Sequence, residues 1–312
     1  MYTPSNNSVQ RIEFKNYPSG HDFHPLGVEV YPSFSGNASN MFVVNHARKR
    51  TYIEQFTVSP SEPVARHIRT ITSRYFNAPN ALALTSPTSF YVTNDHLFTR
   101  RLPIVGQVLP LIESLLGLPF GWVSHVTLNP DLNAASPIQA EQLSAAFIPF
   151  ANGVSISPGG YEVAVASSSS NTVFIYSRDP TSNDLKLRDT IPVPFTPDNL
   201  MYSEDGTLTV AGHPNFPDLV KLAAKKAASS PSWIVALKRL DPNNTILPTM
   251  WDMAAPISAS TKVPAVLTHE METVFQSNGT GFSASTTGLI DSATGVLYTS
   301  GLYTEGLLVC RP

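Results

Sequence analysis

The stretch "FTPDNLMYSEDGTLTVAGHPN", residues 195–215, contains the arrangement that decides the fold. The aromatic residue Phe195 precedes a polar pair, Asp198–Asn199, and a short apolar strand begins directly after that pair at Leu200. The turn SEDG (203–206) and a second apolar run follow. A turn that ends in glycine is typical of a hairpin. The stretch therefore predicts two antiparallel strands, and the first of them begins with two polar side chains.

The same order of an aromatic residue, polar or small residues, a short strand, a turn and a second strand recurs along the chain. It begins again at Phe23, Phe76, Phe150 and, more weakly, Phe282. Third and fourth strands are clearest at 171–179 and 185–193. Repeats of about 40–50 residues built from four short strands are typical of a β-propeller. We expect an all-β protein, one domain over 1–312, with short helical inserts near 103–120 and 217–229.

The polar residues that open these strands predict a metal site. In a propeller the first strand of each blade starts at the central channel, so equivalent residues form a ring. We place Gly27, Asn80, Asn152, Asn199 and Thr286 in this ring, with Asp198 beside it. Side-chain oxygens with at least one carboxylate suit a hard cation such as Ca²⁺. The alternative is that each Asn or Asp forms an Asx turn before its strand.

Composition excludes several classes of partner. Charged residues make up 14% of the 312 residues and the net charge is -3, so nothing favours a nucleic-acid partner. The most apolar segment, 102–123, is interrupted by prolines and Glu113, whereas a membrane span needs about 20 apolar residues. Within it we expect a helix from Leu111 to Leu118 that packs on the core. A lipid surface contacted through 103–120 is the alternative.

Six motifs in order identify a resemblance. They are VVNH (43–46), FYVTNDH (90–96), FANGVSISPGG (150–160), PDNL (197–200), GHPN (212–215) and NGT (278–280). With them the chain resembles the serum paraoxonase/arylesterase family. The resemblance implies a six-bladed β-propeller with a structural and a catalytic calcium ion. It also implies hydrolysis of small-molecule aryl esters and lactones, in which the catalytic ion polarises the carbonyl group.

The resemblance also assigns individual residues. The catalytic calcium ligands would be Asn80, Asn152, Asp198 and Asn199, and the Val28 carbonyl would bind the structural ion. His46 matches one histidine of the family's catalytic dyad, while His96 and His213 match further histidines near the channel. Leu26 stands at the second dyad position, and His24, two residues earlier, would share its face of an extended strand and partly substitute for the missing histidine.

Other departures concern the structural ion and the start of the chain. Ala81 replaces an acidic ligand of the structural ion. The family's N-terminal Glu–Asp pair, and a cysteine that would pair with Cys310, have no counterpart here. We therefore expect a propeller with about one blade incomplete or missing at its N-terminus, and weak calcium binding. The full-length parent would be a secretory-pathway protein, and the sequons at Asn6, Asn37, Asn243 and Asn278 agree with a glycoprotein.

Three other functions were weighed. A non-catalytic propeller that binds a partner agrees with Leu26 and Ala81. A neighbouring propeller enzyme, such as a gluconolactonase-like or strictosidine-synthase-like protein, is disfavoured by VVNH and TNDH. A serine hydrolase of the G-x-S-x-G type is excluded because the chain lacks that motif. The natural substrate and the oligomeric state have no sequence signal.

Overall fold

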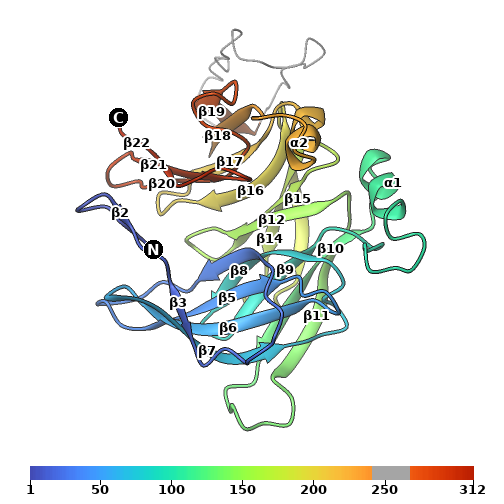
Figure 1. Ribbon diagram of the computed structural model, residues 1–312, viewed down its shortest axis with the longest axis vertical. Coiled ribbons are helices and arrows are strands. Elements are labelled where there is room, and N and C mark those ends of the chain that lie inside the picture. Colours follow the sequence, from blue (N-terminus) through green and yellow to red (C-terminus); the bar gives the residue numbers. More distant parts are fainter. Residues whose placement is uncertain (241–267) are drawn as a thin grey trace. The chain divides into compact units, whose positions relative to one another are not determined.

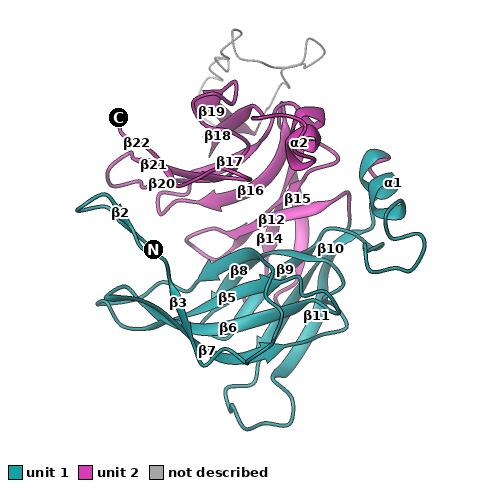
Figure 2. Cartoon of the chain, in the orientation of Figure 1, with its two compact units in different colours: residues 1–115, 119–147 teal, residues 116–118, 148–312 magenta. Residues whose placement is uncertain are grey.

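The structure is a computed structural model that describes residues 1–240 and 268–312. These residues form strands with two short helices and divide into two compact units (Figures 1 and 2). Unit 1 comprises residues 1–115 and 119–147, and unit 2 comprises residues 116–118 and 148–312.

Unit 1 contains two blade sheets. The first has five strands in the order β3-β7-β6-β5-β4: β3 (Glu13–Lys15), β4 (Pro25–Val30), β5 (Ser39–Asn45), β6 (Tyr52–Ser59) and β7 (Glu62–Ile71). The second has four: β8 (Pro79–Ser86), β9 (Ser89–Asn94), β10 (Gly121–Leu128) and β11 (Ile138–Ile148). The N-terminal pair β1 (Tyr2–Thr3) and β2 (Ser8–Val9) forms a separate ribbon. β3 runs parallel to β7 and covers its edge.

Unit 2 contains three blade sheets. They consist of β12 (Ala151–Ile156), β13 (Glu162–Ser167), β14 (Thr172–Arg178) and β15 (Leu185–Pro192); of β16 (Thr196–Tyr202), β17 (Leu208–His213), β18 (Ser232–Arg239) and β19 (His269–Ser277); and of β20 (Ser285–Ile290), β21 (Leu297–Gly301) and β22 (Leu308–Cys310). All neighbouring strands in these sheets are antiparallel. Cys310 on β22 is a free cysteine.

These meander sheets confirm the all-β propeller class but correct the number of blades. The described part of the chain contains five blade sheets, not six, and the last has three strands. The third and fourth strands predicted at 171–179 and 185–193 are present as β14 and β15. The predicted turn at 203–206 connects β16 and β17, and the turns at 157–160 and 291–295 connect the equivalent strand pairs; glycines 160, 206 and 295 adopt positive φ angles there. Glycine takes this conformation without a steric cost.

Burial explains why the second strand of most blades reads as a short apolar run. β9, β13 and β17 are buried along almost their whole length, whereas in β15 only Ile191 is buried and the other residues are half-buried or exposed. A strand covered on both faces needs apolar residues at consecutive positions. Within unit 1, Phe42 and Phe90 from neighbouring sheets lie 5.2 Å apart in one core cluster. Within unit 2, Phe195 contacts Trp233 at 5.6 Å. Each such side chain contributes about 1.5–3 kcal/mol by leaving water.

Both helical inserts exist, with ends that differ from the prediction. Helix α1 spans Leu109–Leu115 rather than 111–118, and Gly117 adopts a positive φ of 59° just after it. Helix α2 spans Phe216–Ala223, so it begins one residue before the predicted 217–229 and ends well before it. Its N-cap, Asn215, accepts a hydrogen bond from the Asp218 backbone, and the chain turns left-handed at Lys225. Caps and left-handed residues thus end both helices earlier than apolar spacing predicts.

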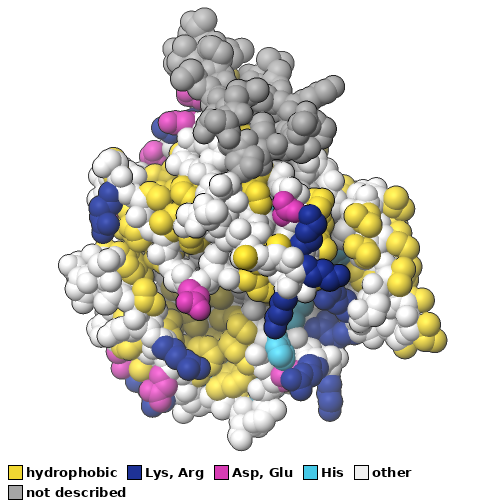
Figure 3. All heavy atoms as spheres, turned by 45° about the horizontal axis from the view of Figure 1, so that its top comes forward, with side chains coloured by type: hydrophobic (Ala, Val, Ile, Leu, Met, Phe, Trp, Pro, Cys, Tyr) yellow, Lys and Arg dark blue, Asp and Glu magenta, His cyan; other side chains and the backbone are white. Residues whose placement is uncertain are grey.

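The α1 segment exposes many large hydrophobic side chains, which gather at the right of Figure 3. Leu115 and Leu116 are each 68% exposed and Ile104 is 99% exposed. No helix in the described ranges has the length and apolar character to cross a membrane. The predicted lipid contact through 103–120 stays a prediction. Of the predicted sequons, Asn6, Asn37 and Asn278 are exposed, and Asn243 lies outside the described residues.

Candidate metal and catalytic site

The polar residues that open the blades occupy β-bulges. In β4, β8, β12 and β16 two residues lie opposite one residue of the next strand: Leu26–Gly27, Asn80–Ala81, Asn152–Gly153 and Asp198–Asn199. In β20 the register shifts at Thr286. Bulge residues leave the ladder and can turn their side chains away from it. This explains why the first strands of the other four blades begin with polar residues, whereas the β4 bulge holds Leu26 and Gly27.

The register refines the predicted ring. Leu26, Asn80, Asn152 and Asp198 are the first residues of their bulges, and Gly27, Ala81, Gly153 and Asn199 are the second. The prediction had grouped Gly27 and Asn199 with Asn80 and Asn152. The difference arises because a bulge adds one residue that cannot be counted from the strand pattern.

Two of the bulge glycines allow neighbouring first strands to approach closely. A Cβ atom at Gly153 would lie 2.6 Å from the Asn199 Cα atom and 2.9 Å from the Asp198 carbonyl oxygen. In unit 1, a Cβ atom at Gly27 would overlap the Asn80 backbone. Only glycine permits such contact. In unit 2 this approach brings the β12 bulge, with Asn152, against the β16 bulge, with Asp198 and Asn199.

In three blades a polar residue at or just after the end of the second strand holds the first bulge residue. Asn80 donates from Nδ2 to Asp95 Oδ2 at 3.1 Å, and Asn152 donates from Nδ2 to Ser168 Oγ at 3.0 Å. His213 Nε2 lies 3.0 Å from Asp198 Oδ2. These contacts fix the orientation of both amides through their nitrogen atoms.

The residues in unit 2 fit a hard cation. Asn152 Oδ1 is buried and has no hydrogen-bond partner in the described part of the chain. The Asp198 carboxylate, 15% exposed, accepts hydrogen bonds from Asn199 Nδ2 at 3.1 Å and from His213. Amide and carboxylate oxygens without a thiolate are what Ca²⁺ binds. Within residues 1–240 and 268–312 no group of three or more His, Cys, Asp or Glu could hold a metal, so any site depends on the asparagines.

The other predicted calcium ligands lie in unit 1. Asn80 is 9% exposed in the β8 bulge, and Val28 pairs with Val43 in the β4–β5 ladder. Asn80 occupies the same bulge position as Asn152. That Asn80 joins the unit 2 residues in one ligand set, and that the Val28 carbonyl binds a second ion, stay predictions.

Of the predicted dyad region, the structure brings His24 and His46 together through the backbone. The His46 backbone N–H donates to the His24 carbonyl oxygen at 2.9 Å, and the His46 Nε2 atom lies 2.5 Å from the Pro79 carbonyl oxygen. The His24 ring is half-exposed and contacts Asp22 Oδ1 at 2.9 Å. β4 begins only at Pro25, and Leu26 lies in its bulge. The regular strand needed for His24 to share a face with Leu26 is therefore absent.

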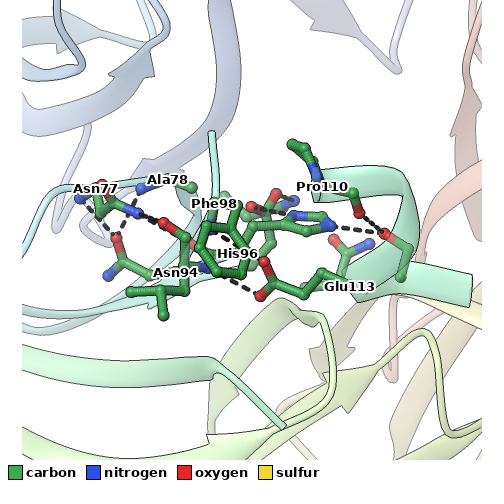
Figure 4. Close-up of polar contacts among 12 residues, drawn as sticks. Asn77, Ala78, Asn94, His96, Phe98, Pro110 and Glu113 are labelled. Carbon is green, nitrogen blue, oxygen red and sulfur yellow. Dashed lines mark hydrogen bonds and ion pairs between the residues drawn. The ribbon is translucent and has the colours of Figure 1, made fainter. Parts of the chain in front are cut away.

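His213 and His96 each pair with a carboxylate. His213 is 3% exposed and contacts Asp198 as described. His96 Nδ1 lies 2.7 Å from Asp95 Oδ1, and its Nε2 lies 2.6 Å from Ser114 Oγ on helix α1 (Figure 4). Burial lowers the pKa of His96, but the hydrogen bond and charge of Asp95 raise it more, so the net pKa is above its usual value.

Sequence reasoning missed Asp95, Ser168 and Ser114. Asp95 follows Asn94 within the TNDH motif. The Asn94 side chain accepts hydrogen bonds from the backbone of Asn77 and Ala78, so it fastens the chain entering β8 (Figure 4). The available signal was a polar residue at the end of the second apolar run, because Asp95 and Ser168 directly follow β9 and β13, and His213 ends β17, where each contacts the bulge.

A family described as Arylesterase matches residues 3–275 of the chain. Among curated proteins, human serum paraoxonase/arylesterase 1 is 29% identical over 194 residues, which is 62% of this chain and 50% of the human protein. Serum paraoxonase/arylesterase 1 of Mus musculus is 30% identical over 197 residues, with the same shares. The chain thus spans about half the length of these relatives. A solved structure of a putative 6-phosphogluconolactonase from Bacteroides uniformis aligns with a TM-score of 0.47 at 14% identity, covering 90% of this chain and 80% of that one.

Proposed function

We propose that the chain, which belongs to the Arylesterase family, is a calcium-dependent hydrolase of aryl esters and lactones. Its substrates would be small molecules with an ester or lactone carbonyl group. The curated relatives are named serum paraoxonase/arylesterases, which supports the aryl ester part of the proposal.

One observation supports the proposal above the others. Asn152 Oδ1 is a buried oxygen without a hydrogen-bond partner in the described residues, and the close approach at Gly153 sets its strand against the Asp198–Asn199 bulge. An unpaired buried carbonyl oxygen costs about 1–3 kcal/mol. A bound cation beside Asp198 would remove that cost.

The roles of the chain's own residues follow from their contacts. Asn152, Asp198 and Asn199 would hold the cation, while Ser168 and His213 orient the first two. Calcium, when bound, would supply polarisation of the substrate carbonyl and stabilise negative charge on its oxygen. Since one carboxylate is present among these ligands, affinity should be low.

His46 would accept the proton of an attacking water molecule. Its Nε2 atom faces a carbonyl oxygen, which can only accept, so Nε2 must carry the hydrogen. In a neutral ring Nδ1 then has the free lone pair. This assigns the base function to Nδ1 of His46.

A second candidate is a propeller that binds a small ligand without turnover. Leu26 lies in the bulge where the resemblance expects a histidine, and it is 47% exposed. Ala81 in the β8 bulge offers no side-chain oxygen. This candidate predicts calcium-dependent ligand binding with no hydrolysis.

The test combines calcium calorimetry with hydrolysis of phenyl acetate and a medium-chain lactone. We expect a dissociation constant for Ca²⁺ above about 10⁻⁶ M and hydrolysis that stops with a chelator. Asp198→Asn should weaken calcium binding, while Asp205→Asn, in the 203–206 turn, should not. Hydrolysis indifferent to the chelator excludes the calcium mechanism, and submicromolar affinity contradicts the ligand set.

A further inference from the structure

Unit 1 contains a chain of three side chains in the order acid, histidine, serine. Asp95 Oδ1 lies 2.7 Å from His96 Nδ1, and His96 Nε2 lies 2.6 Å from Ser114 Oγ. Figure 4 shows the His96 ring with its dashed contact toward helix α1, beside the Pro110 carbonyl. A histidine whose Nδ1 faces a carboxylate and whose Nε2 faces a hydroxyl has the geometry that activates a serine for attack.

Further hydrogen bonds fix the position of Asp95 and of the helix that contains Ser114. The second oxygen of Asp95 accepts the Asn80 amide hydrogen bond at 3.1 Å. Glu113, only 2% exposed, accepts the backbone N–H groups of Leu97 and Phe98 at 2.9 and 3.0 Å. Because Glu113 is the residue before Ser114, these two hydrogen bonds fix the helix to the segment that follows His96. The distance from Ser114 to His96 is therefore set by buried contacts and not by a mobile surface side chain.

The hydrogen bonds also fix which nitrogen can act as a base. The Asp95 carboxylate accepts the Nδ1 proton of His96, so Nε2 of the neutral ring presents its lone pair to Ser114. The Ser114 hydroxyl has a second acceptor, the Pro110 carbonyl oxygen at 2.9 Å, four residues earlier in the helix. A hydroxyl that donates to Nε2 is nucleophilic, whereas one that donates to Pro110 only closes a helical turn.

We propose that Ser114 is a nucleophile that activated carboxylic esters acylate, with His96 as its base and Asp95 as the residue that positions the ring. Ser114 Oγ attacks the carbonyl carbon and passes its proton to His96 Nε2. The bond from that carbon to the leaving oxygen breaks, and the proton on Nε2 moves to the leaving phenolate. Water then hydrolyses the new serine ester with the same histidine as base, which restores the hydroxyl.

Access and surroundings favour apolar acyl groups. Ser114 is half-buried, and its helix neighbours Leu111 and Leu115 are 53% and 68% exposed. An acyl chain that reaches Ser114 from solvent would cover these leucines and remove apolar surface from water. The expected substrates are therefore aryl esters of short to medium-chain acids.

The hydrogen bonds from Leu97 and Phe98 to Glu113 also limit the rate of turnover. The amides of Leu97 and Phe98 donate to Glu113 and are not available to a developing oxyanion. Loss of one oxyanion donor costs about 10²–10³-fold in rate. We expect acylation only by esters with good leaving groups and slow hydrolysis of the acyl-enzyme, so that the serine ester accumulates. No cation takes part, which separates this reaction from the calcium-dependent one.

The test is covalent labelling in the presence of excess chelator. The chain is treated with p-nitrophenyl butyrate or a fluorophosphonate and mapped by peptide mass spectrometry. We expect one label per chain, on Ser114, and none in Ser114→Ala. His96→Gln keeps a hydrogen-bonding side chain but loses the base, and it should lower the labelling rate by about 10²-fold.

Ser136→Ala is the matched control, because Ser136 is an exposed serine of unit 1 that contacts only its own loop backbone among the described residues. It should label like the unchanged chain, and thermal melting of every variant verifies folding. The proposal is overturned if the unchanged chain is labelled elsewhere or not at all, or if the chelator prevents labelling. An equal labelling rate in folded His96→Gln also overturns it. Calcium calorimetry reports on the separate proposal and is unaffected by these outcomes.

Discussion

Two carboxylates, Glu54 in unit 1 and Asp198 in unit 2, differ in how completely their oxygens are used. Glu54 is fully buried and meets five partners at 2.7–3.3 Å: Tyr17, His21, Asn45, His67 and Thr70. Asp198 is 15% exposed and receives hydrogen bonds from Asn199 and His213. A carboxylate offers about four acceptor sites. The partners of Glu54 occupy all of its acceptor sites, so Glu54 is structural. Asp198 has acceptor sites left that can bind a cation.

The pKa of Glu54 agrees with a structural role. Burial raises the pKa, but the hydrogen bonds from Asn45, Thr70, His67 and His21 lower it more, so the net pKa lies below its ordinary value. A folded-state pKa below the unfolded one stabilises the fold above the unfolded pKa. This stabilisation is lost as the pH falls through the folded pKa. At neutral pH the contribution of Glu54 is therefore complete.

The largest expected effect concerns Glu54, the structural carboxylate of the two. Glu54→Ala should lower the free energy of unfolding by about 3–5 kcal/mol, because it leaves buried donors without their charged acceptor. Urea denaturation at neutral pH measures this loss. Glu62→Ala is the control, since Glu62 is 46% exposed and pairs with half-exposed Arg66, a contact worth about 0–1 kcal/mol. Equal losses in the two variants would refute the structural assignment of Glu54.

The sequence predicted the repeated strands because their signals are local. Apolar runs and glycine turns marked β14, β15 and three hairpins within one or two residues. The polar bulges at Asn80, Asn152 and Asp198 were also visible, as polar residues just before an apolar strand. The helix ends were missed because they depend on caps and on single left-handed residues such as Gly117 and Lys225.

Side-chain partners could not be predicted because they depend on pairing between strands. Asp95 meets Asn80, and Ser168 meets Asn152, only because of the register of the second strand against the bulge. A shift of one residue would turn these side chains to the other face. Ser114 meets His96 across 18 residues of mostly irregular chain, and no motif indicated that contact. The five repeats counted in the sequence match the five blade sheets of the described residues, whereas the six blades came from the family resemblance.

The second prediction concerns Gly153, which allows the Asn152 bulge to approach the Asp198–Asn199 bulge closely. Gly153→Ala would place its Cβ atom 2.6 Å from the Asn199 Cα atom, so the two bulges must separate. Overpacking of this kind costs about 1–3 kcal/mol, and calcium binding should weaken with it. Gly159→Ala is the matched control, because its Cβ atom would meet only the Tyr161 ring at 3.6 Å. Unchanged calcium affinity in a folded Gly153→Ala protein would show that Asn152 and Asp198 act separately.

The smallest effect concerns Ser168, which separates ligand orientation from stability. Its Oγ accepts the Asn152 Nδ2 hydrogen and donates to the Pro197 carbonyl oxygen at 2.7 Å, so it joins both bulges of the pair. Ser168→Ala should cost only about 1 kcal/mol in stability. It should weaken Ca²⁺ binding by about tenfold, because Asn152 loses the contact that aims its oxygen. Ser170→Ala is the control, since Ser170 bonds to Ser167 instead. If calorimetry gives the same affinity for both variants, Asn152 is a structural residue and not a calcium ligand, and the contrast with the saturated Glu54 then depends on Asp198 alone.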